Sequence, residues 1–237
     1  VGPLEIVRQL GSPVALDALR VTVVTSLVAH AIVLTVGTPC AYTLATRRFP
    51  GRRALVTLLE LPLVLPPAVA GVGLLAAFGA QGLLGDALEV AGIRIPFTQA
   101  AVVMAIVFVS SPFYLRAAIA AFEAVDADLR DAARTLGAGP GRVFARVALP
   151  LAAGGLGAGS TLAFARGLGE FGATILFAGS LAGVTQTLSL AIYAEFDRDF
   201  DTALAMGALL IIASIVLLGS VKLFSAWTSS RSTSGAD

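Results

Sequence analysis

The residues that could carry out chemistry in this sequence are few and isolated from one another. The single histidine, His30, and the single cysteine, Cys40, both lie in the uncharged apolar run 21–46. One cysteine forms neither a disulfide within the chain nor a cysteine-based metal site, and no metal site is predicted. A histidine in an apolar span is a candidate functional group, but His30 has no second ligand nearby in sequence. We interpret it as a hydrogen-bonding residue that packs between helices or faces a pore.

The patterns that indicate hydrolysis are also missing. The chain has no GxxxxGK[ST] loop for binding the phosphates of ATP, and its only lysine is Lys222. It has no GxSxG motif, and neither 21–46 nor 202–221 contains an acidic residue. An intramembrane hydrolase, which needs such groups, is therefore a weak interpretation. We expect the chain to be no enzyme and to bind no cofactor.

The largest group of polar residues lies in the middle of the chain, at 126–149. Within its first part, apolar side chains recur at the i, i+3, i+4 and i+7 spacing of one helix face. These positions are Leu129, Ala132, Ala133 and Leu136. Asp126 or Asp128 can cap such a helix, and Gly137 can end it. The pattern predicts a short amphipathic helix.

A second short helix is predicted after the turn at 138–140. Pro140 suits the first position of a helix, which would run to about Leu149. Arg142 and Arg146 lie four residues apart on it, and like charges at that spacing repel each other mildly. The arrangement favours contact with anionic lipid headgroups or with an acidic partner.

The rest of the sequence has the composition of an integral membrane protein. Hydrophobic residues make up 57% of the 237 residues, charged residues make up 13%, and the mean hydropathy is +0.90. Soluble domains average about 25% charged residues. The net charge of +1 gives no indication of a nucleic-acid partner.

A membrane-spanning helix needs about 20 mostly apolar residues, and the sequence predicts an all-α protein with about five such spans. They cover 21–46, 54–79, 97–121, 147–167 and 202–222. The uncharged run 171–194 is rich in glycine, threonine and serine. That composition suits a loop or a re-entrant segment better than a sixth span.

Basic residues set the predicted orientation of the spans. Arginines gather after the first span, at 47–53, and after the third, at 130–146. The loops at 86–94 and 195–201 are poor in basic residues or acidic. We therefore expect the N-terminus outside, the C-terminus in the cytoplasm, and the polar stretch at 126–149 on the cytoplasmic side.

Two of the spans contain residues that disturb a helix or tighten its packing. The second span carries Pro62, Pro66 and Pro67 in LPLVLPP, and each proline removes a backbone donor, so we expect a kink or a break there. The fourth carries GGLGAGS at 154–160, whose small residues allow a neighbouring helix to approach closely. For the prolines, a functional break and a packing role are both open.

The polar stretch resembles the EAA loop of bacterial ABC importer permeases. In that loop Glu-Ala-Ala is followed at fixed spacing by glycine, by isoleucine and by Leu-Pro, and every spacing is matched here. The matching residues are Asp131, Ala132, Ala133, Gly137, Val147, Leu149 and Pro150. Asp131 stands where glutamate is usual and Val147 where isoleucine is usual, so charge and apolar character are kept.

Further stretches resemble one branch of this family, the molybdate-type permeases. They are LPLVLPP (61–67), ARTLGAGPGRV (133–143), LAFARGLGEFGATILFAG (162–179) and GVTQTLSLAIY (183–193). The resemblance covers 18–223, and GEFGAT at 169–174 favours molybdate over sulfate, tungstate or another small solute such as thiamine. Ser189 departs from the pattern, because such permeases often have proline there.

The resemblance implies the type I, MetI-like importer architecture, with a permease domain at 20–224 between an extracytoplasmic segment, 1–19, and a cytoplasmic tail, 225–237. It implies a multi-pass protein of the bacterial cytoplasmic (inner) membrane. The partners would be a second copy of the chain, two ATP-binding cassette ATPase subunits that use the ATP, and an extracytoplasmic binding protein. The implied ATPase-coupling residues are Asp131, Ala132, Ala133, Leu136, Gly137, Gly139, Pro140, Gly141, Val147, Leu149 and Pro150.

Hydroxyl groups and backbone amides can escort an oxyanion through a passage without trapping it. Candidates for the passage and its gate are Pro66, Pro67, Ser160, Thr161, Arg166, Glu170, Thr174, Ser180, Thr185 and Thr187. For any one hydroxyl, ordinary helix or loop polarity is the simpler explanation. Arg166 and Glu170 form either a charge-neutralising ion pair or a gate element. A passive channel or structural membrane protein is the remaining alternative, and the docking loop argues against it.

Overall fold

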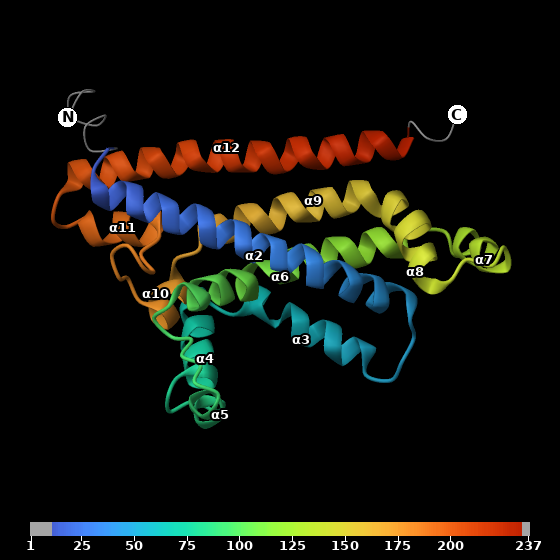
Figure 1. Ribbon diagram of the computed structural model, residues 1–237, viewed down its shortest axis with the longest axis horizontal. Coiled ribbons are helices and arrows are strands. Elements are labelled where there is room, and N and C mark those ends of the chain that lie inside the picture. Colours follow the sequence, from blue (N-terminus) through green and yellow to red (C-terminus); the bar gives the residue numbers. More distant parts are fainter. Residues whose placement is uncertain (1–10, 234–237) are drawn as a thin grey trace.

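Four long helices form a bundle along one axis in the computed structural model, which describes residues 11–233 and the side chains of 11–223 (Figure 1). They are α2 (Pro13–Thr46), α6 (Gln99–Glu123), α9 (Leu149–Leu168) and α12 (Phe200–Thr233). With one bent helix pair, they bring the candidate membrane spans among the described residues to at most five. The prediction of an all-α fold with about five spans is confirmed, while 1–10 and 234–237 of the predicted terminal segments lie outside the described residues.

The core of the bundle lies where α6 packs against both α2 and α9. Glycines on one side of α9 allow this contact. A Cβ atom added at Gly155 would lie 2.6 Å from the Cβ of Ala121, and one added at Gly159 would lie 2.7 Å from the Cβ of Ala117. The predicted role of the GGLGAGS stretch in close packing is confirmed.

The second predicted span is broken. Helix α3 (Arg52–Val64) runs along the bundle, and α4 (Pro67–Phe78) leaves it at an angle of 119°. Pro66 and Pro67 lack the backbone donors that would continue α3, and Pro67 instead occupies the first turn of α4, where no donor is needed. The predicted break at LPLVLPP is confirmed, and α4 with α5 (Gly85–Val90) forms an arm beside the bundle (Figure 1).

The glycine-rich region 171–194 contains no helix long enough to cross a membrane. It folds into α10 (Gly172–Ala178), a loop, and α11 (Leu188–Glu195), which have seven and eight residues. About 20 residues would be needed for a span. Helix α11 begins where the backbone N–H of Leu188 donates a hydrogen bond of 2.8 Å to the Thr22 hydroxyl of α2.

The polar middle of the chain forms one separate short helix, α7 (Ala127–Thr135), as predicted. The second predicted short helix is wrong as a separate element. Helices α8 (Pro140–Val143) and η1 (Phe144–Ala148) continue directly into α9, so that one helix runs over Pro140–Leu168. The wider π turn of η1, in which the Leu149 N–H bonds to the Phe144 carbonyl, lets the helix pass Pro150 without ending.

The start of α12 is fixed by Asp199. Its carboxylate accepts hydrogen bonds from the Thr202 hydroxyl at 2.6 Å and from the backbone N–H groups of Thr202 and Asp201 at 3.2 and 3.1 Å. These bonds, that from the Thr202 side chain most of all, hold the pKa of Asp199 below its usual value. A charged carboxylate at a helix N-terminus is also favoured by the helix dipole.

Candidate functional site

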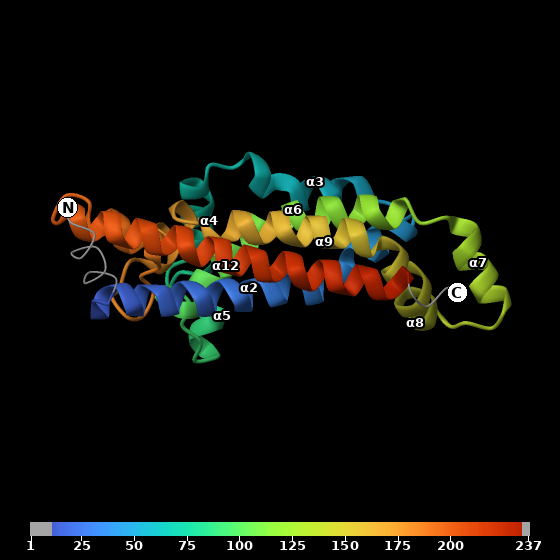
Figure 2. The ribbon, with the colours of Figure 1, turned by 90° about the horizontal axis from the view of Figure 1, so that it is seen from above.

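Helix α7 lies beyond one end of the bundle, which we call the α7 end (Figures 1 and 2). It presents uncovered apolar side chains. None of its residues is buried. Leu129 is 50% exposed and Leu136, its C-terminal cap, is 88% exposed. The Asp126 carboxylate accepts a 2.9 Å hydrogen bond from the Asp128 N–H at its start, and Gly137, with φ of +83°, turns the chain at its end. An amphipathic helix held away from the bundle with its apolar face uncovered has the exposed apolar patch that is typical of surfaces which bind other proteins.

The predicted coupling residues fall into two groups in the structure. Most lie on α7 and the turn that follows and are exposed: Asp131, Ala132, Leu136, Gly137, Gly139, Pro140 and Gly141, with Ala133 half-buried. The other three, Val147, Leu149 and Pro150, are half-buried where the long helix re-enters the bundle. Asp131 is joined to Arg134 of the same helix at 2.8 Å. The first group can touch a partner, while the second anchors the helix behind it.

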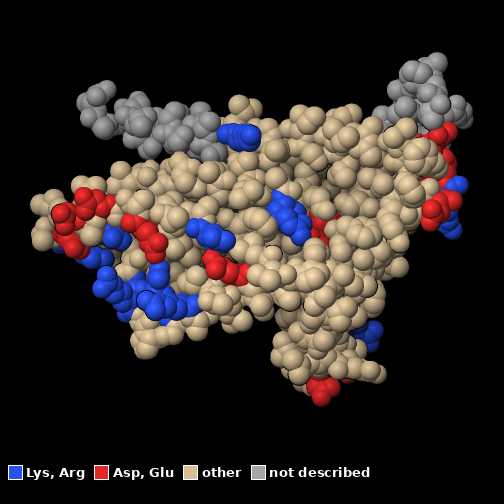
Figure 3. Space-filling model, turned by 180° about the vertical axis from the view of Figure 1, so that it is seen from behind, with Lys and Arg blue, Asp and Glu red and all other residues tan. Residues whose placement is uncertain are grey.

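Arginines surround the same end of the bundle. Figure 3 shows Lys and Arg side chains gathered there on the rear face, over the connection from α2 to α3. One of them, Arg52, is paired with Glu123 at 2.6 Å, which fastens the start of α3 to the end of α6. Arg47, Arg48 and Arg53 of this connection are exposed.

At the far end of α9, Arg166 and Glu170 form the predicted ion pair. Arg166 Nη1 lies 2.8 Å from Glu170 Oε2, and the Glu170 side chain is only 1% exposed. Its other oxygen, Oε1, accepts a 2.8 Å hydrogen bond from the backbone N–H of Ala173. Glu170 therefore connects the long helix to the first turn of α10.

The proline break and the GEFGAT stretch, which are far apart in sequence, pack against each other. A Cβ atom added at Gly172 would lie 3.0 Å from the Cβ of Pro67. One added at Gly71 would lie 2.7 Å from the Ala173 carbonyl oxygen. Helix α10 thus lies directly on α4, and Pro66, Pro67, Arg166, Glu170 and Thr174 belong to one packed unit. Thr174 is fully buried there, and its hydroxyl has no hydrogen-bond partner among the described residues.

The predicted hydroxyl residues lie in several separate places in this chain. Ser160 bonds to His30 Nε2 at 3.0 Å and, with it, lines a cavity of about 900 Å³ between α2, α9 and α12. The Thr161 hydroxyl instead donates to the Gly157 carbonyl of its own helix. Ser180, Thr185 and Thr187 lie in the loop before α11, where Ser180 accepts from the Gln186 side chain and Thr185 from the Leu181 N–H.

His30 has the packing role that its sequence context suggests. Besides its bond to Ser160, its ring lies 4.9 Å from that of Phe164 in an edge-to-face arrangement. About two turns further along α2, the Thr38 and Tyr114 hydroxyls lie 2.6 Å apart and join α2 to α6. These polar contacts hold the central helices together.

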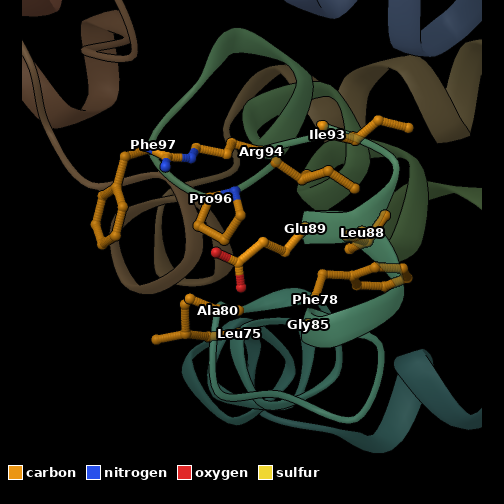
Figure 4. Close-up of a pocket in the computed structure, with 13 residues that line it drawn as sticks. Leu75, Phe78, Ala80, Gly85, Leu88, Glu89, Ile93, Arg94, Pro96 and Phe97 are labelled. Carbon is orange, nitrogen blue, oxygen red and sulfur yellow. The ribbon is translucent and has the colours of Figure 1, made fainter.

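A second hollow, of about 640 Å³, lies on the arm formed by α4 and α5. In Figure 4 the Glu89 carboxylate points into this hollow, and Arg94 and Pro96 lie along its edge. Phe97 has a positive φ of 61°, which is unusual for a bulky residue. Its ring is so close to Gly179 that a Cβ atom there would lie 3.0 Å from it.

Neither residue of one charged pair was named in the sequence analysis. Arg116 of α6 lies 3.3 Å from Glu60 of α3, and their side chains are 65% and 38% exposed. Each residue lies beside an apolar run of the sequence. A charge next to an apolar run is the one feature that could have drawn attention to these two residues. Their pairing depends on how α3 lies against α6, which neither run reveals.

Comparison with known proteins agrees with this arrangement. The family model described as "Binding-protein-dependent transport system inner membrane component" matches residues 34–231. The molybdenum transport system permease protein ModB of Mycobacterium tuberculosis is 48% identical over 209 residues, which are 88% of this chain and 79% of ModB. The sulfate transport system permease protein CysT of Escherichia coli K12 is 36% identical over 212 residues, 89% of this chain and 76% of CysT.

A solved structure has the same fold at low sequence identity. The structure of a bacterial ABC transporter that imports the acidic polysaccharide alginate has a chain with a TM-score of 0.75 and 18% identity, covering 98% of this chain and 84% of that one. The region that the family model matches contains the last part of α2, the broken second span, the α7 region, α6, α9 and most of α12. The chain is thus a multi-pass membrane permease subunit, not an enzyme, and belongs to the family of inner membrane components of binding-protein-dependent ABC importers.

Proposed function

We propose that this chain is the permease through which an ATP-driven importer moves molybdate into the cell. The identity to a molybdenum permease is 48%, against 36% to a sulfate permease over a similar length. The GEFGAT stretch, whose Glu170 holds α10 against the long helix, supports the same cargo. Sulfate is the second candidate, because the sulfate relative also matches most of the chain.

The observation that carries the importer role is the uncovered apolar face of α7. In this proposal, α7 and the turn at 137–141 fit a groove on a separate ATPase subunit, which hydrolyses the ATP. Leu129 and Leu136 supply the apolar contact, and Ala132 with Ala133 allows close approach. Such a helix-in-groove contact is a common way for one protein to hold another.

The long helix supplies a mechanism for coupling. It runs without interruption over 29 residues from Pro140 to Leu168, which is about 43 Å at 1.5 Å per residue. A displacement of α7 by the closing ATPase therefore reaches the Arg166–Glu170 pair as a movement of one rigid element. From there it passes through Ala173 and α10 to α4, so that the unit packed around the proline break opens and closes.

The assembly that we propose has two permease copies, two ATPase subunits and an extracytoplasmic binding protein. The α7 end lies in the cytoplasm, because it carries most of the arginines. The N-terminus and the arm of α4 and α5 then lie on the outer side, where the binding protein delivers the anion. Two copies around a two-fold axis enclose the passage between them.

Calorimetry on the binding protein that works with this chain tests the cargo. Molybdate and sulfate are titrated separately into the purified binding protein, and the complete complex is then tested for uptake of each labelled anion. We expect the binding protein to bind molybdate at least about 100-fold more tightly, a difference of about 2.7 kcal/mol. Tighter binding and faster uptake of sulfate would make the sulfate proposal the correct one.

A further inference from the structure

The pair formed by Arg116 and Glu60 lies within apolar helices, away from the ends of the bundle. The pair Arg52–Glu123 joins the same two helices, α3 and α6, at the α7 end. Glu60 is eight residues beyond Arg52 and Arg116 is seven before Glu123, or about 12 and about 10 Å along the helices at 1.5 Å per residue. Both helices therefore place the inner pair at the same depth. Measured from the Arg52–Glu123 pair, that depth is about a third of a hydrocarbon core of about 30 Å.

The two side chains of this pair are uncovered. Arg116 is 65% exposed and Glu60 is 38% exposed, and α3 has no buried residue. Charged side chains inside a membrane face a water-filled cavity or other protein, because hydrocarbon does not solvate them. On the opposite side of the bundle, the middle of α12 exposes the aliphatic side chains Ile211, Ile212, Ile215 and Val216. Helix α3 also exposes Leu58, Leu61 and Val64, but the face that it forms with α6 carries the charged pair. The face formed by α3 and α6 is therefore the one turned away from lipid.

Figure 3 shows this distribution on the rear face of the molecule. Apart from the basic group at the α7 end, the face is mostly uncharged, with isolated Lys or Arg and Asp or Glu side chains beside each other in its middle. Within α3 and α6, Glu60 and Arg116 are the charged residues that lie away from the α7 end, since Arg52, Arg53 and Glu123 are terminal residues of these helices.

The ion pairs Arg116–Glu60 and Arg166–Glu170 differ in how firmly their arginines are held. Glu170 is buried, lies 2.8 Å from Arg166 and also bonds to Ala173. Arg116 contacts Glu60 through Nε, at 3.3 Å, and its two Nη groups form no hydrogen bond with the residues whose side chains are described. Four N–H donors of the Arg116 fork are thus available, in the planar geometry that fits two oxygens of a tetrahedral oxyanion.

We propose that Arg116 attracts the oxyanion into the passage along α3 and α6, and that Glu60 promotes the release of the oxyanion from Arg116. This inference rests on the proposed oxyanion transport and adds the residue pair that assists it. A lone arginine inside a membrane would hold a divalent anion too firmly for transport, because conduction requires binding weak enough for release. Glu60, which is already within 3.3 Å of Arg116, competes with the anion for the guanidinium group.

Uptake of labelled molybdate by proteoliposomes that contain the complete complex tests the roles of both residues. Arg116→Gln should lower Vmax/KM by about tenfold, the equivalent of about 1.4 kcal/mol. Glu60→Gln should raise the affinity of the passage for the anion and slow its release, so that both KM and Vmax become lower. A purely structural ion pair would give the two variants the same defect, and such a result would overturn the inference.

The matched control is Arg20→Gln, which removes an exposed arginine near the start of α2. It should leave uptake unchanged. If the wild-type complex transports neither molybdate nor sulfate, the proposed function itself fails. If it transports one of them and Arg116→Gln behaves like Arg20→Gln, only the role of Arg116 fails.

Thiol labelling tests whether the face is in contact with water. In a Cys40→Ser background, which removes the only native cysteine, Arg116→Cys and Glu60→Cys should react with a charged, water-soluble thiol reagent. Ile211→Cys, on the aliphatic face of α12, should react at least about tenfold more slowly, since the thiolate hardly forms in hydrocarbon. Equal protection of all three positions would contradict a water-filled passage.

Discussion

At the scale of single residues, Glu170 connects more of the structure than any other candidate. One oxygen neutralises Arg166, and the other accepts a hydrogen bond from the first turn of α10. Because its side chain is almost fully buried, neither bond can be replaced by water. The residue therefore holds the end of the long helix, α10 and, through Gly71 and Gly172, the arm that begins at the proline break.

Glu170→Ala should destabilise the permease by about 2 kcal/mol, because it leaves Arg166 without its partner and the Ala173 N–H without its acceptor. Glu170→Gln keeps an oxygen for Ala173 and should lose about half as much. Thermal unfolding of the detergent-solubilised protein measures both changes. Equal midpoints for wild type and Glu170→Ala would show that the two bonds do not hold this end together.

At the scale of elements, α7 and the start of the next helix at Pro140 were predictable from the sequence, whereas the continuity of that helix from Pro140 to Leu168 was not. The spacing of Leu129, Ala132, Ala133 and Leu136 is a local pattern, and the helix ends at the glycine that the pattern requires. The continuation from Pro140 through Pro150 depends on the π turn of η1, which no residue spacing predicts. The uncovered apolar face of α7 is the element on which the coupling proposal depends.

Leu136→Asp should weaken co-purification of the ATPase subunit by at least about tenfold, because a charge replaces an apolar contact at the docking surface. The permease itself should stay folded, since Leu136 is 88% exposed. Val90→Asp on α5 is the matched control: Val90 is 91% exposed but lies on the arm. Retention of the ATPase by the Leu136 variant at the wild-type level would argue against docking through α7.

At the scale of the whole molecule, the sequence predicted what local patterns determine. Hydropathy predicted the long helices, and the prolines of LPLVLPP predicted where the second span is broken. The 119° angle between α3 and α4 depends on α10 packing against Gly71, and the hydrogen bond from Leu188 to Thr22 joins residues 166 positions apart. The pairing of Arg116 with Glu60 is likewise a tertiary contact. Such contacts leave no spacing pattern in a single sequence.

The packing of α9 on α6 gives a stability test with an internal control. Gly155→Ala should destabilise the protein by about 1–3 kcal/mol, because the added Cβ would lie 2.6 Å from Ala121. Gly154→Ala, on the same helix with nothing within 4 Å of the added atom, should be neutral or stabilise by up to about 1 kcal/mol. Thermal unfolding in detergent compares the two, and equal effects would mean that α9 can move away from α6 without cost.

The central claim is that a separate ATPase drives this permease through α7. Its most direct test is uptake of labelled molybdate into proteoliposomes that contain the chain, its ATPase subunit and the external binding protein. We expect uptake only when ATP is present on the side of the ATPase, and we expect Leu136→Asp to abolish it while Leu136→Val, which keeps an apolar side chain at this exposed position, does not. Uptake that continues without ATP, at the same rate in both variants, would identify a passive channel and contradict the account.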